Sequence, residues 1–109
     1  MKKTTTTWVK IGIVIGMYLA GFFLFDSLPD ILPTHWNAAG VADGFMAKEK
    51  AILLFPSIAL GMLILFYFIP KIDPFKKRYE QFERAWEILQ ITLLSLFAYF
   101  YAVSLYSAL

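Results

Sequence analysis

Three long apolar runs without a charged side chain constrain this sequence more than any other feature. They cover residues 11–25, 51–70 and 88–109, and all ten Lys and Arg and all eight Asp and Glu lie before or between them. A helix needs about twenty predominantly apolar residues to cross roughly 30 Å of hydrocarbon. The two longer runs meet this length, and the first does so if its helix begins near Trp8, with Lys10 extending its ammonium to the headgroups. The pattern predicts an all-α integral membrane protein with three transmembrane helices.

The size and composition of the chain agree with one membrane domain. It has 109 residues, of which 60% are hydrophobic, whereas a soluble domain averages about 45–50% apolar residues. We expect a single domain over residues 1–109, with spans at about 8–26, 51–70 and 86–109, an outer loop at 27–50 and a cytoplasmic loop at 71–85.

The charged and reactive residues exclude several classes of protein. The net charge is only +2, and no basic stripe alternates with aromatic residues, so we expect no nucleic-acid partner. The chain has no cysteine, which removes disulfides, Cys-ligated zinc and thiol nucleophiles. We also expect no ionisable residue deep in a span, which argues against a proton- or ion-coupled transporter.

The distribution of basic residues predicts the orientation. Three lie in the first ten residues, two in the loop 26–50 and five in the loop 71–87. With the N-terminus in the cytoplasm, eight of the ten follow the positive-inside rule. The first run is interpreted as an uncleaved signal anchor, because no A-x-A-like cleavage site follows it. The loop 27–50 is therefore expected outside the cell membrane.

This outer loop has the composition of an ordered segment. Pro29 and Pro33 restrict its backbone, and Gly40 and Gly44 can adopt the positive φ angles of tight turns. Its apolar residues are Leu28, Ile31, Leu32, Trp36, Val41, Phe45 and Met46. We expect the loop to fold onto the membrane surface or over the helix ends.

His35 is the only histidine, and three roles compete for it. It could pin the turn around Asn37 by hydrogen bonding. It could ligate a metal such as zinc together with Asp30 or Asp43. It could also serve in recognition or as an acid or base, because its unperturbed pKa lies near physiological pH. One histidine, no cysteine and no second ligand motif favour the structural role.

The spacing of residues in this loop resembles a known motif. The sequence reads Leu28-Pro29-Asp30, then Pro33-Thr34-His35-Trp36-Asn37, Gly40, Asp43-Gly44 and Lys48. This pattern is similar to a membrane domain of unknown function at the N-terminus of the sporulation-delay toxin immunity family, whose members are multi-pass bacterial and archaeal membrane proteins. The resemblance implies a cell-membrane location and a role in immunity or signalling. The ligand-binding or loop-organising residues would be Asp30, Pro33, Thr34, His35, Trp36, Asn37, Gly40 and Asp43.

Small residues recur on one face of the first helix. Gly12, Gly16 and Ala20 are spaced by four, which allows a second backbone to approach closely. We expect this stripe to pack against another helix, either within the chain or in a second copy. In the third helix, Gln90 is the costliest side chain to place in hydrocarbon and should face protein.

The leading interpretation is a non-enzymatic membrane protein that recognises a peptide toxin or envelope ligand through its outer loop and uses no cofactor. A cytoplasmic regulator would dock on Lys76, Lys77 and Arg78. The alternative is a membrane enzyme or metal-binding protein centred on His35 with Asp30 and Asp43. A third interpretation is a structural subunit that forms homo-oligomers through Gly12, Gly16 and Ala20.

Overall fold

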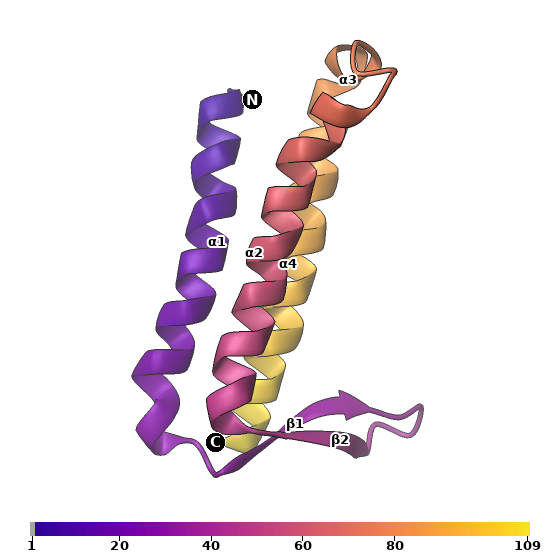
Figure 1. Cartoon of the computed structure of the whole chain (residues 1–109). Helices are drawn as coiled ribbons and strands as arrows, with labels where there is room; N and C mark the ends of the chain where they lie inside the picture. The colour runs from indigo at the N-terminus through magenta and orange to yellow at the C-terminus, as the bar shows by residue number, and fades with distance from the viewer. Residues whose placement is uncertain (1) are drawn as a thin grey trace.

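Three long helices lie side by side and form the body of the molecule (Figure 1). The computed structural model describes residues 2–109. The long helices are α1 (Lys3–Leu24), α2 (Lys48–Ile72) and α4 (Glu83–Ala108), and the connections hold the turn η1 (Phe25–Ser27), strands β1 (Ile31–Trp36) and β2 (Ala42–Ala47), and helix α3 (Arg78–Gln81). The predicted number of long apolar helices is therefore confirmed.

Each long helix is long and apolar enough to cross a membrane. They contain 22, 25 and 26 residues, so each rises roughly 33–39 Å at 1.5 Å per residue. Each also begins before its predicted span, because the charged residues that flank the apolar runs continue the helices. By length and composition, the chain thus has three helices that could span a membrane.

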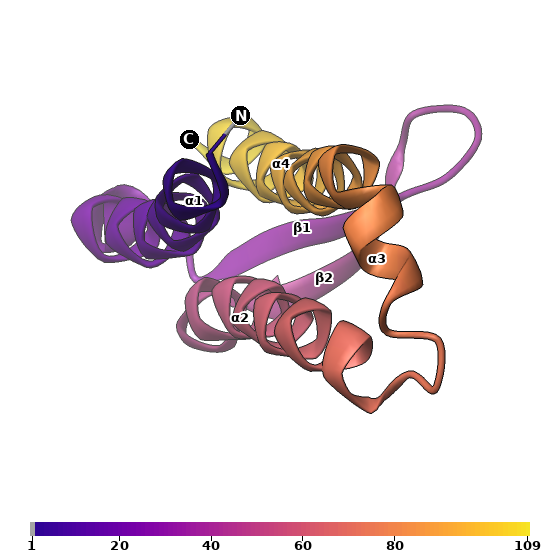
Figure 2. The same ribbon diagram turned by 90° about the horizontal axis from the view of Figure 1, so that it is seen from above.

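The prediction of an all-α fold is too simple, because the loop between α1 and α2 forms an antiparallel hairpin. Strands β1 and β2 pair Ile31 with Ala47 and Leu32 with Met46, and the register becomes irregular near His35. The hairpin crosses one end of the bundle, and its turn projects beyond the helices (Figures 1 and 2). The sequence does not predict these strands, because β1 contains Pro33 and β2 contains Gly44, and both residue types are depleted in regular strands.

The core runs through the bundle and continues beneath the hairpin. Buried side chains from all three helices form it, including Val14, Ala59 and Leu94, and Leu32 of β1 joins it with no exposed surface. The rings of Phe55 and Tyr101 contact each other in a tilted arrangement, with centroids 5.6 Å apart. Because the hairpin contributes to the same core as the helices, it is an integral part of the fold.

The closest approach of α1 to its neighbours occurs at Gly21. A Cβ atom added there would lie 2.9 Å from Ile52 Cβ and would overlap the Tyr101 hydroxyl. Added Cβ atoms at Gly12 and Gly16 would meet nothing within 4 Å. Within this chain, therefore, close helix packing depends on Gly21, and the predicted stripe faces an open groove of about 430 Å³ between α1 and α4.

The connection from α2 to α3 is organised by Asp73. Its Oδ1 accepts a hydrogen bond from the Phe75 N–H at 2.8 Å, and its Oδ2 accepts one from the Tyr79 hydroxyl at 2.9 Å. These two bonds hold the pKa of Asp73 below its ordinary value, with the backbone donor contributing most. The turn thereby closes the end of the bundle opposite the hairpin.

Candidate functional site

The base of the hairpin is fixed by Lys48, the first residue of α2. Its ammonium donates hydrogen bonds to the carbonyl oxygens of Phe25 at 3.0 Å and Leu28 at 3.1 Å, and lies 4.3 Å from the Phe25 ring centroid. Its backbone N–H donates to the carbonyl oxygen of Asp30 at 2.9 Å. Lys48 thus satisfies carbonyl groups at the start of η1 and just after it, and ties both ends of the hairpin together.

The middle of β1 is attached to the last turns of α4. The Ser104 hydroxyl donates a hydrogen bond to the Pro33 carbonyl oxygen, and Ser104 is 1% exposed. Nothing in the sequence around Ser104 indicates a strand as its partner. Helix α4 therefore holds the hairpin from a position more than seventy residues away in the chain.

Asn37 organises the turn between the strands. Its side-chain Oδ1 accepts hydrogen bonds from the N–H groups of Ala39 at 2.9 Å and Val41 at 3.1 Å. Its carbonyl accepts from Gly40, which has a φ of +78° that favours glycine. These contacts give Asn37 and Gly40 of the motif a defined part in the geometry of the turn.

His35 and Asp43 face each other across the hairpin. The His35 Nδ1 and Asp43 Oδ1 lie 2.5 Å apart, with side chains 70% and 44% exposed. Gly44 permits this arrangement, because a Cβ there would lie 2.9 Å from His35 Cβ. With Nδ1 engaged by the carboxylate, Nε2 is the ring nitrogen left for an external partner.

The structure does not assemble the predicted triad of His35, Asp30 and Asp43. Within residues 2–109, no group of three His, Cys, Asp or Glu side chains is placed to hold a metal ion. Asp30 takes part in the hairpin through its backbone carbonyl. Of the three residues of the metal or enzyme interpretation, only His35 and Asp43 therefore have side chains in contact.

Large apolar side chains lie exposed around this pair. Ile31 is 58% exposed, Val41 59% and Phe45 61%. We call these three residues together with His35 and Asp43 the hairpin surface. Trp36 is half-buried and pairs with Ala42, so it lies at the edge of this surface. The hairpin surface combines apolar area with one oriented hydrogen-bonding pair, as binding surfaces do.

A second polar cluster, missed by the sequence analysis, joins α1 to α4 near the other end of the bundle. The Lys10 ammonium donates hydrogen bonds to Glu87 Oε2 and Gln90 Oε1, both at 2.8 Å. The three residues are 6%, 5% and 2% exposed. The expectation that Lys10 extends to the headgroups is wrong, because Glu87 provides a buried counter-charge. The burial of Gln90 against protein is confirmed.

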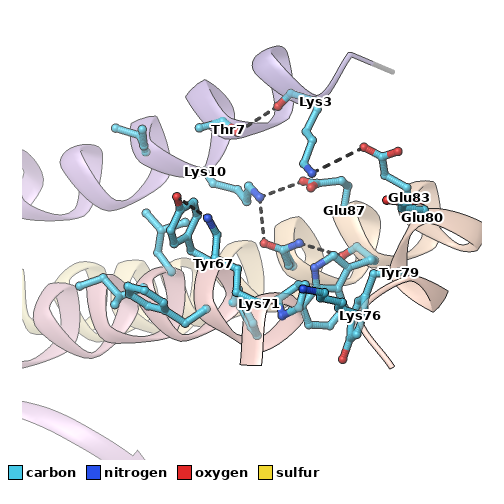
Figure 3. Close-up of a pocket in the computed structure, with 18 of the residues that line it drawn as sticks. Lys3, Thr7, Lys10, Tyr67, Lys71, Lys76, Tyr79, Glu80, Glu83 and Glu87 are labelled. Atoms are coloured by element: carbon cyan, nitrogen blue, oxygen red, sulfur yellow. Dashed lines mark hydrogen bonds and ion pairs between the residues drawn. The ribbon is translucent and has the colours of Figure 1, made fainter. Parts of the chain in front are cut away.

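This cluster belongs to the lining of a cavity of about 880 Å³ between the three long helices (Figure 3). Figure 3 shows Lys10 and Glu87 linked inside it, with Lys3 and Glu83 linked nearby. Its charged residues are Lys3, Lys10, Lys71, Lys76, Lys77, Glu80, Glu83 and Glu87. We call it the lysine-lined cavity. Of the predicted basic docking residues, Lys76 and Lys77 line this cavity, whereas Arg78 lies over the Phe75 ring.

The comparisons with known proteins bear on the region that contains the hairpin. No curated protein and no solved structure matches the chain. One family model matches, from the middle of α1 through the hairpin and into α2. Residues 12–60 of this chain match the family described as "Domain of unknown function (DUF1648)".

Proposed function

We propose that this chain is a non-enzymatic membrane protein that recognises a peptide or envelope ligand through the hairpin surface. One observation carries the proposal: the hairpin is fixed to the helices while its outward side chains stay exposed. Lys48, Ser104 and the buried Leu32 hold it in place. A surface that is already ordered loses little conformational entropy on binding, so its contacts contribute more fully to affinity.

The chemistry of the hairpin surface supports a peptide ligand. Phe45 and Ile31 offer apolar contact area, and aromatic side chains are enriched among residues that dominate binding energy. The His35–Asp43 pair offers one free imidazole nitrogen, which can accept or donate a hydrogen bond, and carboxylate oxygens, which accept hydrogen bonds from backbone or polar groups. Such a surface suits a short amphipathic segment.

The wider setting of this function is also a proposal. The excess of basic residues in the first ten residues and in the loop 71–87 supports a cytoplasmic N-terminus and an outward-facing hairpin. The resemblance of the hairpin motif to the toxin immunity family supports a bacterial or archaeal cell membrane and a role in immunity or signalling. A cytoplasmic regulator would dock near Lys76, Lys77 and Arg78. A second copy would pack on the groove at Gly12, Gly16 and Ala20.

Photocrosslinking in living cells tests the recognition. A photoreactive phenylalanine analogue at Phe45 should form a discrete adduct with a peptide or envelope protein. The same analogue at Phe68, which is 49% exposed on α2, serves as the control and should react with lipid alone. The yield of the adduct at position 45 should fall when the same protein also carries Asp43→Ala. Lipid adducts alone at both positions would contradict a recognition role for the hairpin surface.

A further inference from the structure

We propose that the lysine-lined cavity binds an anionic phospholipid, with the phosphate held by lysine side chains at its mouth and the acyl chains along its apolar wall. This site lies at the opposite end of the bundle from the hairpin surface, as the positions of α3 and the hairpin in Figure 1 make clear. The proposal does not depend on the ligand proposed for the hairpin.

The size and position of the cavity suit a lipid. Its volume of about 880 Å³ lies near the upper end of the roughly 300–1,000 Å³ typical of small-molecule sites. The three helices around it are each apolar and long enough to cross a membrane. Phospholipid is therefore the molecule present at the highest concentration beside the cavity.

The charges in the lining leave an excess of positive charge for a phosphate. Lys10 is neutralised by Glu87 at 2.8 Å, and Lys3 has Glu83 at 3.9 Å. Lys71 donates a hydrogen bond only to the uncharged Tyr67 hydroxyl. Within residues 2–109, neither Lys76 nor Lys77 forms a salt bridge. Glu80 is the remaining acidic side chain of the lining, so three lysines outnumber it.

The lining combines exposed lysines with an apolar wall, and a phospholipid likewise has a charged headgroup and apolar chains. The two loop lysines, Lys76 and Lys77, are exposed, whereas the wall of α2 contributes Leu63, Ile64 and Phe66. Deeper in the cavity, the Lys10 ammonium uses two of its three N–H donors on Glu87 and Gln90. Its third N–H remains for a phosphate or ester oxygen of the lipid.

Trp86 provides a direct probe, because it lines the cavity and contacts Phe66 and Tyr79 with ring centroids 5.8 and 5.2 Å apart. The chain has three tryptophans, so Trp8→Phe with Trp36→Phe leaves Trp86 as the only one. In vesicles that mix two lipids, brominated phosphatidylglycerol should quench its fluorescence more strongly than brominated phosphatidylcholine at equal mole fraction.

Two variants test whether the lysines of the cavity cause the preference for phosphatidylglycerol. Lys76→Gln with Lys77→Gln should lower the relative affinity for phosphatidylglycerol by roughly tenfold or more, because each basic residue near an anionic lipid surface contributes about 1 kcal/mol. Lys50→Gln is the matched control, since Lys50 is exposed at the hairpin end and outside the cavity. It should leave the preference unchanged. In the protein with all its lysines in place, high salt should weaken the preference for phosphatidylglycerol. This measurement needs no substitution in the cavity.

Three results would overturn the proposal. Equal quenching by the two brominated lipids would show no selectivity for an anionic headgroup. An unchanged preference in the Lys76→Gln and Lys77→Gln protein would remove the lysines from the site. Inorganic phosphate or glycerol 3-phosphate that displaces the brominated lipid at millimolar concentration would show that the site takes a soluble phosphate compound instead.

Discussion

Each end of this molecule contains a close pair of ionisable side chains, but the two pairs have opposite surroundings. At the hairpin end, His35 and Asp43 are 2.5 Å apart with side chains 70% and 44% exposed. Near the other end, Lys10 and Glu87 are 2.8 Å apart with side chains 8% and 7% exposed. An exposed pair is free to meet a ligand and adds little stability. A buried pair is costly to break, because the remaining charge has no partner.

The largest expected effect follows from breaking the buried pair. Glu87→Gln or Lys10→Met alone should lower the free energy of unfolding by about 3–5 kcal/mol, because each leaves an uncompensated buried group. Reversible unfolding in mixed detergent and lipid micelles measures this. The double variant Lys10→Met with Glu87→Leu is the control and should recover most of the loss. If each single variant unfolds like the unmodified protein, the pair has no such role.

The next effect contrasts two glycines of α1. Gly21→Ala should lower the free energy of unfolding by about 1–3 kcal/mol, since the new methyl group would overlap the Tyr101 hydroxyl and approach Ile52. Gly16→Ala meets nothing within 4 Å and should be neutral or slightly stabilising. The same unfolding measurement applies to both. Equal losses for the two variants would mean that helix packing does not depend on Gly21.

A second substitution at Gly16 tests whether copies of the chain associate. Gly16→Leu places a branched side chain in the open groove between α1 and α4, which should prevent a second helix from packing there. Chemical crosslinking in membranes should give an oligomer band for the unmodified chain and no such band for Gly16→Leu. If the oligomer persists unchanged in Gly16→Leu, the small residues of α1 do not mediate association and face lipid instead.

At the hairpin end, stability and recognition should separate. His35→Ala should change the free energy of unfolding by only about 0–1 kcal/mol, because the pair with Asp43 is exposed. It should nevertheless abolish the adduct formed by a photoreactive group at Phe45. His35→Gln keeps a hydrogen-bonding side chain and tests how much of the loss is due to the imidazole. Stoichiometric zinc in the purified protein that is lost in both His35→Ala and Asp43→Ala would instead favour the metal-binding alternative.

The smallest expected effect concerns pH and the turn at Asp73. The pKa of Asp73 is lowered in the folded protein, so its contribution to stability is complete above the pKa of the unfolded chain. That contribution should disappear as the pH falls through the lower, folded-state value. Asp73→Asn should remove this acid-dependent part of the thermal midpoint. A midpoint whose pH dependence is the same in both proteins would contradict the proposed bonds to Phe75 and Tyr79.

The helices could be predicted from the sequence because a charge-free run of about twenty residues has few alternatives to a membrane span. The hairpin was predicted only as an ordered loop. Its strands depend on contacts made after folding, such as Ser104 with Pro33 and the burial of Leu32. Local propensity argues against strands that contain Pro33 and Gly44.

Of the candidate site, the turn residues and the pair His35–Asp43 were within reach of the sequence, because they are close neighbours in the chain. The cluster of Lys10 with Glu87 and Gln90 was not, since its members are separated by 77 and 80 positions. One signal was present: Glu87 and Gln90 are three residues apart, which places both on one face of a helix. The sequence does not indicate that this face of α4 would pack against Lys10 of α1.

The most direct test of the account asks on which side of the membrane each end lies. The chain has no cysteine, so Ala39→Cys at the hairpin turn and Gln81→Cys at the end of α3 each introduce one unique thiol. A membrane-impermeant maleimide added to intact cells should label position 39 and spare position 81 until the membrane is opened. Labelling of position 81 with protection of position 39 would place the hairpin in the cytoplasm and contradict recognition of an external ligand. Labelling of both in intact cells would contradict the three-span topology itself.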